Sequence, residues 1–133
     1  TIPIEVLRHI KNFRFSMLDS VYQTPENRAV YDWYVGQLLH RHVLLPTGEV
    51  TIQDRGNPSG QISTTMDNNM VNTFLQAFEF AYIHPELDLD ELDVLYSQCD
   101  AAIYGDDRIS SWPCVPDDYV NVVTSMYEHV FGM

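Results

Sequence analysis

Apolar residues recur at intervals of three and four positions in four stretches of the chain, which is the period of a helix with one buried face. The pattern predicts helices over about the first 18 residues and at about 25–40, 63–82 and 117–131. Thr24-Pro25 supports the second start, because threonine caps a helix and proline suits its first turn. The third helix is expected to be central, since a broad apolar stripe runs along it: Met66, Met70, Val71, Phe74, Leu75 and Phe78.

Two other stretches change to the alternating period of a strand, and turn residues interrupt each of them. "HVLLPTGEVTIQ" predicts a hairpin around Pro46-Thr47-Gly48, and "CDAAIYGDDRISSW" predicts another around Gly105-Asp106. Before the second hairpin, an acidic connector turns into a short helix at about 90–97. Helices and antiparallel hairpins in this order indicate an α+β fold.

The composition indicates a globular chain with a core of ordinary size. Its 133 residues are 45% hydrophobic and 12% aromatic, so one domain or part of one is expected. No stretch approaches the roughly 18 apolar residues of a membrane span, and the N-terminus lacks the regions of a signal peptide. Two cysteines are too few for a disulfide framework or a zinc knuckle. We therefore expect an intracellular protein without a transmembrane segment.

The charge is strongly acidic: 19 Asp and Glu against 7 Lys and Arg give a formal net charge of -12. On this evidence a nucleic-acid partner is disfavoured, because phosphate contacts require a basic surface. The basic cluster of Arg8, Lys11 and Arg14 has helical spacing, and we expect it to form a solvated helix face rather than an RNA contact.

Two adjacent carboxylates, Asp106 and Asp107, follow Tyr104 and Gly105 at the bend of the second hairpin. Carboxylates a few ångströms apart raise each other's pKa unless a cation neutralises them. Such oxygen ligands suit a hard divalent ion, Mg²⁺ or Mn²⁺. Gly-Asp-Asp is also ordinary turn chemistry, so the tripeptide alone leaves both interpretations open.

A second polar feature lies in "RGNPSGQISTTMDNNMVNTF". Ser59 and Gly60 lie at the crest of a glycine-rich loop, and Thr64 and Asn68 follow at i and i+4 on one face of the third helix. Hydroxyls and amides donate and accept hydrogen bonds without charge, as reading a sugar hydroxyl requires. The alternative is plain capping by Ser63 or Thr64 with an exposed helix face behind it.

Together these features resemble motifs B and C in the palm of RNA-dependent RNA polymerases from positive-strand RNA viruses. The matching residues are Ser59, Gly60, Thr64, Asn68, Asn72, Tyr104, Gly105, Asp106 and Asp107. Among these enzymes, "GNPSGQISTTMDNNMVNTFLQAFEF" and "YGDDRIS" are most similar to the astrovirus polymerases. "TIPIEVLRHIKNFRF" resembles the helix after motif A, and "MYEHVFGM" resembles the start of motif D. The resemblance therefore implies that residues 1–133 are one partial domain, a palm subdomain truncated at both ends.

The resemblance also implies a reaction, template-directed RNA synthesis by two-metal nucleotidyl transfer. Asp106 would bind both catalytic Mg²⁺ (or Mn²⁺) ions, and Asp107 would support the metal site more peripherally. Tyr104, Gly105 and Asn72 would support the motifs.

The other motif residues would contact the nucleotide. Ser59, Thr64 and Asn68 would position the ribose of the incoming nucleoside triphosphate, and Gly60 would let the loop flex. The implied partners are the RNA template, the nascent RNA, and the remaining fingers, thumb and palm segments of the polymerase. The implied location is the host cell cytoplasm, in viral replication complexes.

The sequence departs from the family pattern in what it lacks. Motif A supplies another metal-binding Asp and a ribose-selecting Asp, which we expect just upstream of Thr1. The later lysine of motif D and the basic fingers and thumb are also absent, and the basic surface that grips RNA lies largely in those parts. We therefore expect residues 1–133 alone to be inactive.

Two alternatives remain. A reverse transcriptase-like palm also places Tyr-x-Asp-Asp at a hairpin, although the Ser-Gly-x3-Thr-x3-Asn helix favours the RNA-copying viral enzyme. An acidic, non-catalytic interaction module with fortuitous motif matches is the alternative from another class.

Overall fold

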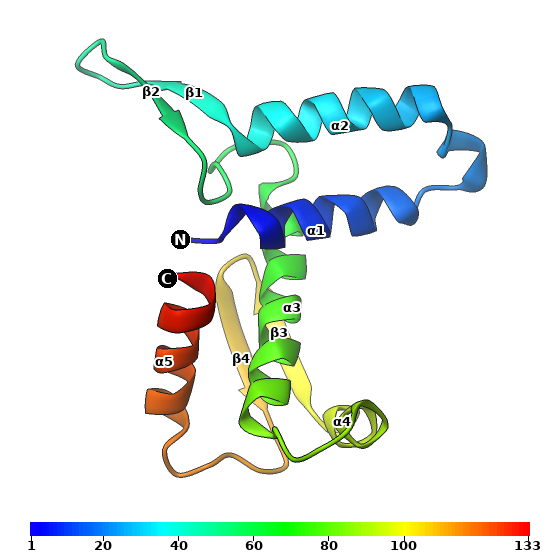
Figure 1. Ribbon diagram of the computed structural model, residues 1–133, viewed down its shortest axis with the longest axis vertical. Helices are drawn as coiled ribbons and strands as arrows, with labels where there is room; N and C mark the ends of the chain where they lie inside the picture. Colours follow the sequence, from blue (N-terminus) through cyan, green and yellow to red (C-terminus); the bar gives the residue numbers. More distant parts are fainter. The chain divides into compact units, whose positions relative to one another are not determined.

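The computed structural model describes residues 1–133, and these form two compact units, 1–67 and 68–133. Figure 1 shows their elements. The helices are α1 (Ile4–Ser16), the 3-10 helix η1 (Ser20–Tyr22), α2 (Pro25–Leu39), α3 (Thr64–Ile83), α4 (Leu89–Tyr96) and α5 (Tyr119–Phe131). The strands are β1 (Arg41–Leu44), β2 (Val50–Gln53), β3 (Asp100–Tyr104) and β4 (Asp107–Ser111). The predicted helices and hairpins are present, which confirms the α+β fold.

In the first unit, α1 packs against α2, and the antiparallel β1–β2 hairpin follows α2 directly (Figure 1). Thr24 caps α2 as predicted, because its hydroxyl accepts a hydrogen bond from the Asn27 amide at 3.2 Å, and Pro25 occupies the first turn. The buried apolar side chains of this unit are Val6, Leu7, Ile10, Phe15, Val35, Leu38 and Leu39.

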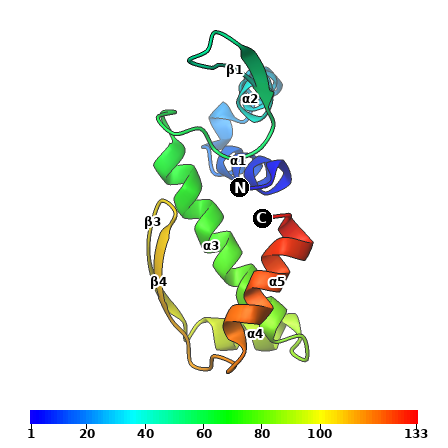
Figure 2. The same ribbon diagram turned by 90° about the vertical axis from the view of Figure 1, so that its left-hand side faces the viewer.

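In the second unit, α3 is the central element, as the sequence predicted. Figure 2 shows the β3–β4 hairpin on one side of α3 and α5 on the other. The Phe80 ring of α3 packs against α4 and the end of the hairpin. Its centroid lies 5.3 Å from that of Tyr96 on α4 and 5.6 Å from that of Trp112 after β4. Phe78 packs against Phe131 of α5, with 5.0 Å between the ring centroids. The hairpin, α4 and α5 are therefore all fixed to α3.

The buried faces of two helices differ from the predicted stripes. On α1, intervals of three and four predict a stripe of Val6, Ile10, Phe13 and Met17. Val6 and Ile10 are buried, but Phe13 and Met17 are 49% and 68% exposed, and Leu7 and Phe15 are buried in their place. On α3, Val71 and Leu75 of the predicted stripe are buried, together with Phe80, which the prediction left out, whereas Met66 is 58% exposed. Intervals of three and four define several neighbouring stripes on one helix, and only tertiary packing decides which of them is covered.

None of the helices is both long and apolar enough to cross a membrane. The two cysteines, Cys99 and Cys114, are free. Burial raises the pKa of the Cys99 thiol, so this group is held in its neutral form.

Candidate functional site

The acid tip of the second unit consists of Gly105, Asp106 and Asp107. Tyr104 of β3 pairs with Asp107 of β4, so Gly105 and Asp106 form a two-residue turn. Gly105 has φ +64°, the backbone angle that the first position of a type II′ hairpin turn requires. The sequence thus places both carboxylates at the end of a tight antiparallel hairpin, as predicted.

Two asparagines of α3 hold the backbone of the acid tip. The Asn69 side-chain oxygen accepts a hydrogen bond from the Gly105 amide at 2.5 Å. The Asn72 side-chain amide donates to the Asp106 carbonyl at 3.1 Å, and the carbonyls of Gly105 and Asp107 each lie 3.4 Å away. Asn69 and Asn72 are three positions apart and share one face of the helix. The turn is thereby fixed through its main chain.

The carboxylates of the acid tip have no polar partner within the chain. Asp106 and Asp107 are both exposed, and neither side chain forms a hydrogen bond or an ion pair. Adjacent unpaired carboxylates on a fixed backbone fit a hard divalent cation. No group of three or more Asp, Glu, His or Cys side chains is close enough to hold a metal ion, so this chain offers two carboxylates.

Arg108 joins the acid tip to a buried carboxylate. It follows Asp107 on β4, and its guanidinium donates two hydrogen bonds to Glu79 of α3, at 2.7 and 2.9 Å. It also donates to the Asn72 side-chain oxygen at 3.3 Å. Both bonds to Glu79 come from Nη2, and a hydrogen bond between two charged groups is stronger than one between neutral groups.

Two tyrosines of α5 complete the Glu79 cluster, which we define as Glu79, Arg108, Tyr119 and Tyr127. Glu79 is 1% exposed, and it accepts hydrogen bonds from the hydroxyl of Tyr119 at 2.8 Å and from that of Tyr127. Burial and the hydrogen bond to Glu79 raise the pKa of Tyr119 to about 12, and the same causes raise the pKa of Tyr127. Both hydroxyls therefore remain donors to the carboxylate at neutral pH.

In the first unit, Ser59 and Gly60 are the exposed central residues of the turn from Pro58 to Gln61. The Gln61 amide donates to the Pro58 carbonyl at 3.4 Å, and Gly60 has φ +83°. This angle at the third position is that of a type II turn, which favours glycine. Ser59 thus lies at the crest of the loop, as predicted.

Thr64 makes a local contact with the loop that differs from the capping interpretation, because a helix cap accepts from a backbone N–H and this hydroxyl faces two carbonyls. Its hydroxyl lies 2.7 Å from the Pro58 carbonyl and 2.8 Å from the Gln61 carbonyl, to which it can donate its one hydrogen. The hydroxyl oxygen keeps its capacity to accept. Asn68 is partly exposed one turn further along α3. Thr64 therefore closes the loop, whatever further role its oxygen has.

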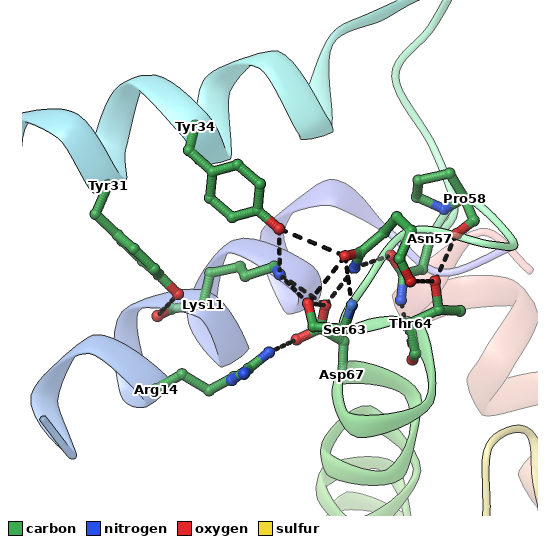
Figure 3. A network of polar contacts seen from close by, with 10 residues as sticks. Lys11, Arg14, Tyr31, Tyr34, Asn57, Pro58, Ser63, Thr64 and Asp67 are labelled. Carbon is green, nitrogen blue, oxygen red and sulfur yellow. Dashed lines mark hydrogen bonds and ion pairs between the residues drawn. The ribbon is translucent and has the colours of Figure 1, made fainter.

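Asp67 is the centre of a buried polar cluster, the Asp67 cluster, shown in Figure 3. Its carboxylate is 0% exposed and pairs with Lys11 at 2.7 Å and with Arg14 at 2.6 Å. It also accepts hydrogen bonds from Gln61 at 2.8 Å and from Ser63 at 2.9 Å. These five residues join α1, the loop and the start of α3.

The Asp67 cluster corrects the interpretation of the basic residues on α1. Lys11 was expected on a solvated face, but it is 1% exposed and bonded to Asp67. Burial opposes ionisation of Asp67, yet hydrogen bonds from Lys11, Arg14 and Ser63 outweigh it and hold the pKa of the carboxyl below its usual value. The negative charge of Asp67 therefore compensates the positive charge of the buried Lys11.

Sequence reasoning missed Asn69, Asp67, Glu79 and Arg108. Two signals were present: Asn69 shares a helix face with Asn72, and Glu79 interrupts the apolar stretch "LQAFEFAY". An acid inside such a stretch indicates a buried, paired carboxylate, because burying it unpaired is too costly. The partner itself cannot be identified from spacing.

Comparisons with known proteins agree with the motifs. The sequence profile of a family described as viral RNA-dependent RNA polymerase matches residues 1–133. The chain is 60% identical to part of the non-structural polyprotein 1AB of Ovine astrovirus 1 and 59% identical to part of that of Mink astrovirus 1. The corresponding identity with Human astrovirus-1 is 54%. No solved structure matches the chain.

The matched region is a small part of each relative. Each alignment covers 100% of this chain, but it covers 10% of the Ovine and Mink astrovirus polyproteins and 9% of the Human astrovirus-1 polyprotein. The chain thus spans about a tenth of the curated relatives it matches. With a profile match over its whole length, this chain belongs to the viral RNA-dependent RNA polymerase family.

Proposed function

We propose that residues 1–133 form part of the palm of a viral RNA-directed RNA polymerase, a nucleotidyltransferase that copies viral RNA. The observation that carries this proposal is the acid tip, where Asp106 and Asp107 stand exposed and unpaired on a backbone held by Asn69 and Asn72. We call the longer polymerase that contains this segment the parent polymerase.

The acid tip would supply carboxylate ligands. Asp106, at the turn itself, would contribute to both divalent metal sites, and Asp107, at the start of β4, would contribute more peripherally. When bound, two Mg²⁺ or Mn²⁺ ions activate the primer hydroxyl and stabilise the triphosphate and its leaving group. The role of Asn69, Asn72 and Gly105 is to fix the main chain, so that the two carboxylates need not reorganise when cations bind.

The Ser59 loop and the first turns of α3 would supply neutral groups for the sugar. Ser59 is exposed at the crest of a turn, and the hydroxyl oxygen of Thr64 and the amide of Asn68 lie one helical turn apart on α3. Such groups can bond a ribose hydroxyl, which is what distinguishes RNA precursors from DNA precursors. Gly60, at φ +83°, would allow the turn to change conformation as the nucleotide enters.

The partners of the parent polymerase would be nucleoside triphosphates, the RNA template and the nascent RNA, in replication complexes of the host cell cytoplasm. The grip on RNA would come mainly from its fingers, thumb and remaining palm. This division is supported by the net charge of -12, because a surface of that sign repels phosphates.

The test of this function compares the parent polymerase with residues 1–133 alone. The parent polymerase is expected to incorporate ribonucleotides on an RNA template only when Mg²⁺ or Mn²⁺ is present. The isolated chain is expected to give no incorporation above background, because it brings two carboxylates to a site for two metals. Incorporation by residues 1–133, or synthesis by the parent in excess chelator, would contradict the proposal.

Asn68 provides a separate test of sugar selection. In the parent polymerase, Asn68→Ala is expected to reduce the preference for ribonucleotides over deoxyribonucleotides by about tenfold, the value of one hydrogen bond to the ribose. The measurement is the ratio of kcat/KM for the two sugars. Thr65→Ala, at an exposed position on the same helix, is the matched control. An unchanged ratio in the Asn68 variant would remove this residue from the site.

A further inference from the structure

Gln61 is bonded at both ends of its side-chain amide. Its nitrogen donates to Asp67 at 2.8 Å, and Asn57 lies 3.4 Å away as a weaker acceptor. Its oxygen accepts from the Ser63 amide at 2.7 Å, and the Ser63 hydroxyl, whose one hydrogen is shared with Asp67, lies 3.0 Å away. Tyr34 of α2 reaches the same oxygen at 3.5 Å (Figure 3). A half-buried glutamine with this many partners has little freedom to move.

Gln61 closes the turn that carries Ser59 and Gly60. Gln61 is the last residue of the turn in which Ser59 and Gly60 are the central pair, and its own amide closes that turn. Ser59 forms no hydrogen bond of its own, and Gly60 resists distortion least of all residue types. The direction in which Ser59 points is therefore set by how firmly Gln61 is held.

The anchor of Gln61 is itself rigid. Asp67 is fully buried, and Lys11 and Arg14 of α1 bind its two oxygens. A hydrogen bond to a charged acceptor is stronger than one between neutral groups, particularly where water is excluded. The contact between Gln61 and Asp67 thus ties an exposed turn to the core of the first unit.

We propose that Gln61 is a positioning residue, which holds the Ser59-Gly60 turn in the conformation that reads the sugar of the incoming nucleotide, with Asp67 as its anchor. The inference rests on the proposed polymerase function. Gln61 itself need not touch the nucleotide, because both ends of its amide are already bonded within the protein.

The test uses Gln61→Ala in the parent polymerase. We expect hydrogen exchange of the amides in residues 57–64 to become about tenfold faster, because the turn loses a hydrogen bond to a charged group. Exchange elsewhere and the midpoint of thermal unfolding should change far less. The KM for nucleoside triphosphates should rise about tenfold with a much smaller change in kcat, and selection against deoxyribonucleotides should weaken.

Two further variants separate positioning from folding. Gln37→Ala removes an exposed glutamine on α2 that makes no side-chain contact, and it should change neither exchange nor KM. Gln61→Met keeps the length of the side chain without its hydrogen bonds, so it should behave like Gln61→Ala if bonding is what matters. Recovery of normal kinetics by Gln61→Met would overturn the proposal.

The outcomes distinguish this inference from the proposed function. Unchanged exchange at 57–64 in Gln61→Ala would show that Gln61 does not hold the turn. Faster exchange with unchanged KM and sugar selection would show that the turn is held but does not position the nucleotide, which also overturns the inference. If the unmodified parent polymerase shows no synthesis, the proposed function has failed, and the exchange measurement still decides whether Gln61 holds the turn.

Discussion

Asp106→Ala in the parent polymerase is expected to lower the rate of nucleotide incorporation by about a thousandfold or more. Metal ions contribute several kcal/mol of transition-state stabilisation in reactions of this kind, and a loss of about 4 kcal/mol corresponds to that factor. The measurement is single-turnover incorporation at saturating nucleotide and several Mg²⁺ concentrations. Asp107→Ala should give a smaller loss, because we assign it the more peripheral role.

This substitution should leave the fold intact. The Asp106 carboxylate is exposed and makes no protein contact, and the bonds that fix the acid tip go to its backbone carbonyl, which alanine retains. Asp117→Ala, at another exposed aspartate of the same unit, is the matched control and should keep full activity. An Asp106 variant with a normal melting temperature and more than trace synthesis would contradict the assignment of Asp106 to the metal sites.

The acid tip could be predicted from sequence because its geometry is local. A two-residue turn with glycine at its first position fixes the hairpin, and the hairpin fixes where both carboxylates lie. The same reasoning located Ser59 at a turn crest, since Gly60 supplies the positive φ that the turn requires. The proposed chemistry of each residue remains a prediction beyond this local geometry.

The buried polar clusters could not be predicted, because their partners are far apart in the sequence. Lys11 and Asp67 are separated by 56 positions, and spacing along α1 alone made Lys11 look like one of three solvated cations. The spacing of charged residues along one helix is the same whether they face solvent or pair with a buried partner on another helix. Only the contact with α3 distinguishes them.

The contacts of the basic residues change how the charge is understood. At least five of the seven Lys and Arg side chains are committed to bonds within the chain: Lys11, Arg14, Arg28, Arg41 and Arg108. Few cations therefore remain for phosphates. Most cationic side chains of this segment thus stabilise its own loops and hairpins. This agrees with the proposal that other parts of the parent polymerase bind the RNA.

Glu79→Leu should cost the second unit about 3–5 kcal/mol of unfolding free energy, because breaking a buried ion pair leaves the other charge uncompensated. Arg108 would lose its carboxylate partner, and the hydroxyls of Tyr119 and Tyr127 would lose their acceptor. The measurement is urea unfolding of residues 1–133 at pH 7. Fluorescence of Trp112, which packs edge-on against Tyr119 at 5.4 Å between ring centroids, reports on this unit.

Three further variants make this prediction specific to the cluster. Trp33→Phe serves as the common background, because it leaves Trp112 as the sole tryptophan reporter. Glu86→Gln, at an exposed acid of the same unit, should change the free energy of unfolding by no more than about 0.5 kcal/mol. Adding Arg108→Met to Glu79→Leu should recover part of the loss, since no guanidinium is then left without its carboxylate. If Glu79→Leu unfolds at the same urea concentration as the Trp33→Phe background without it, Glu79 does not hold Arg108, α5 and α3 together.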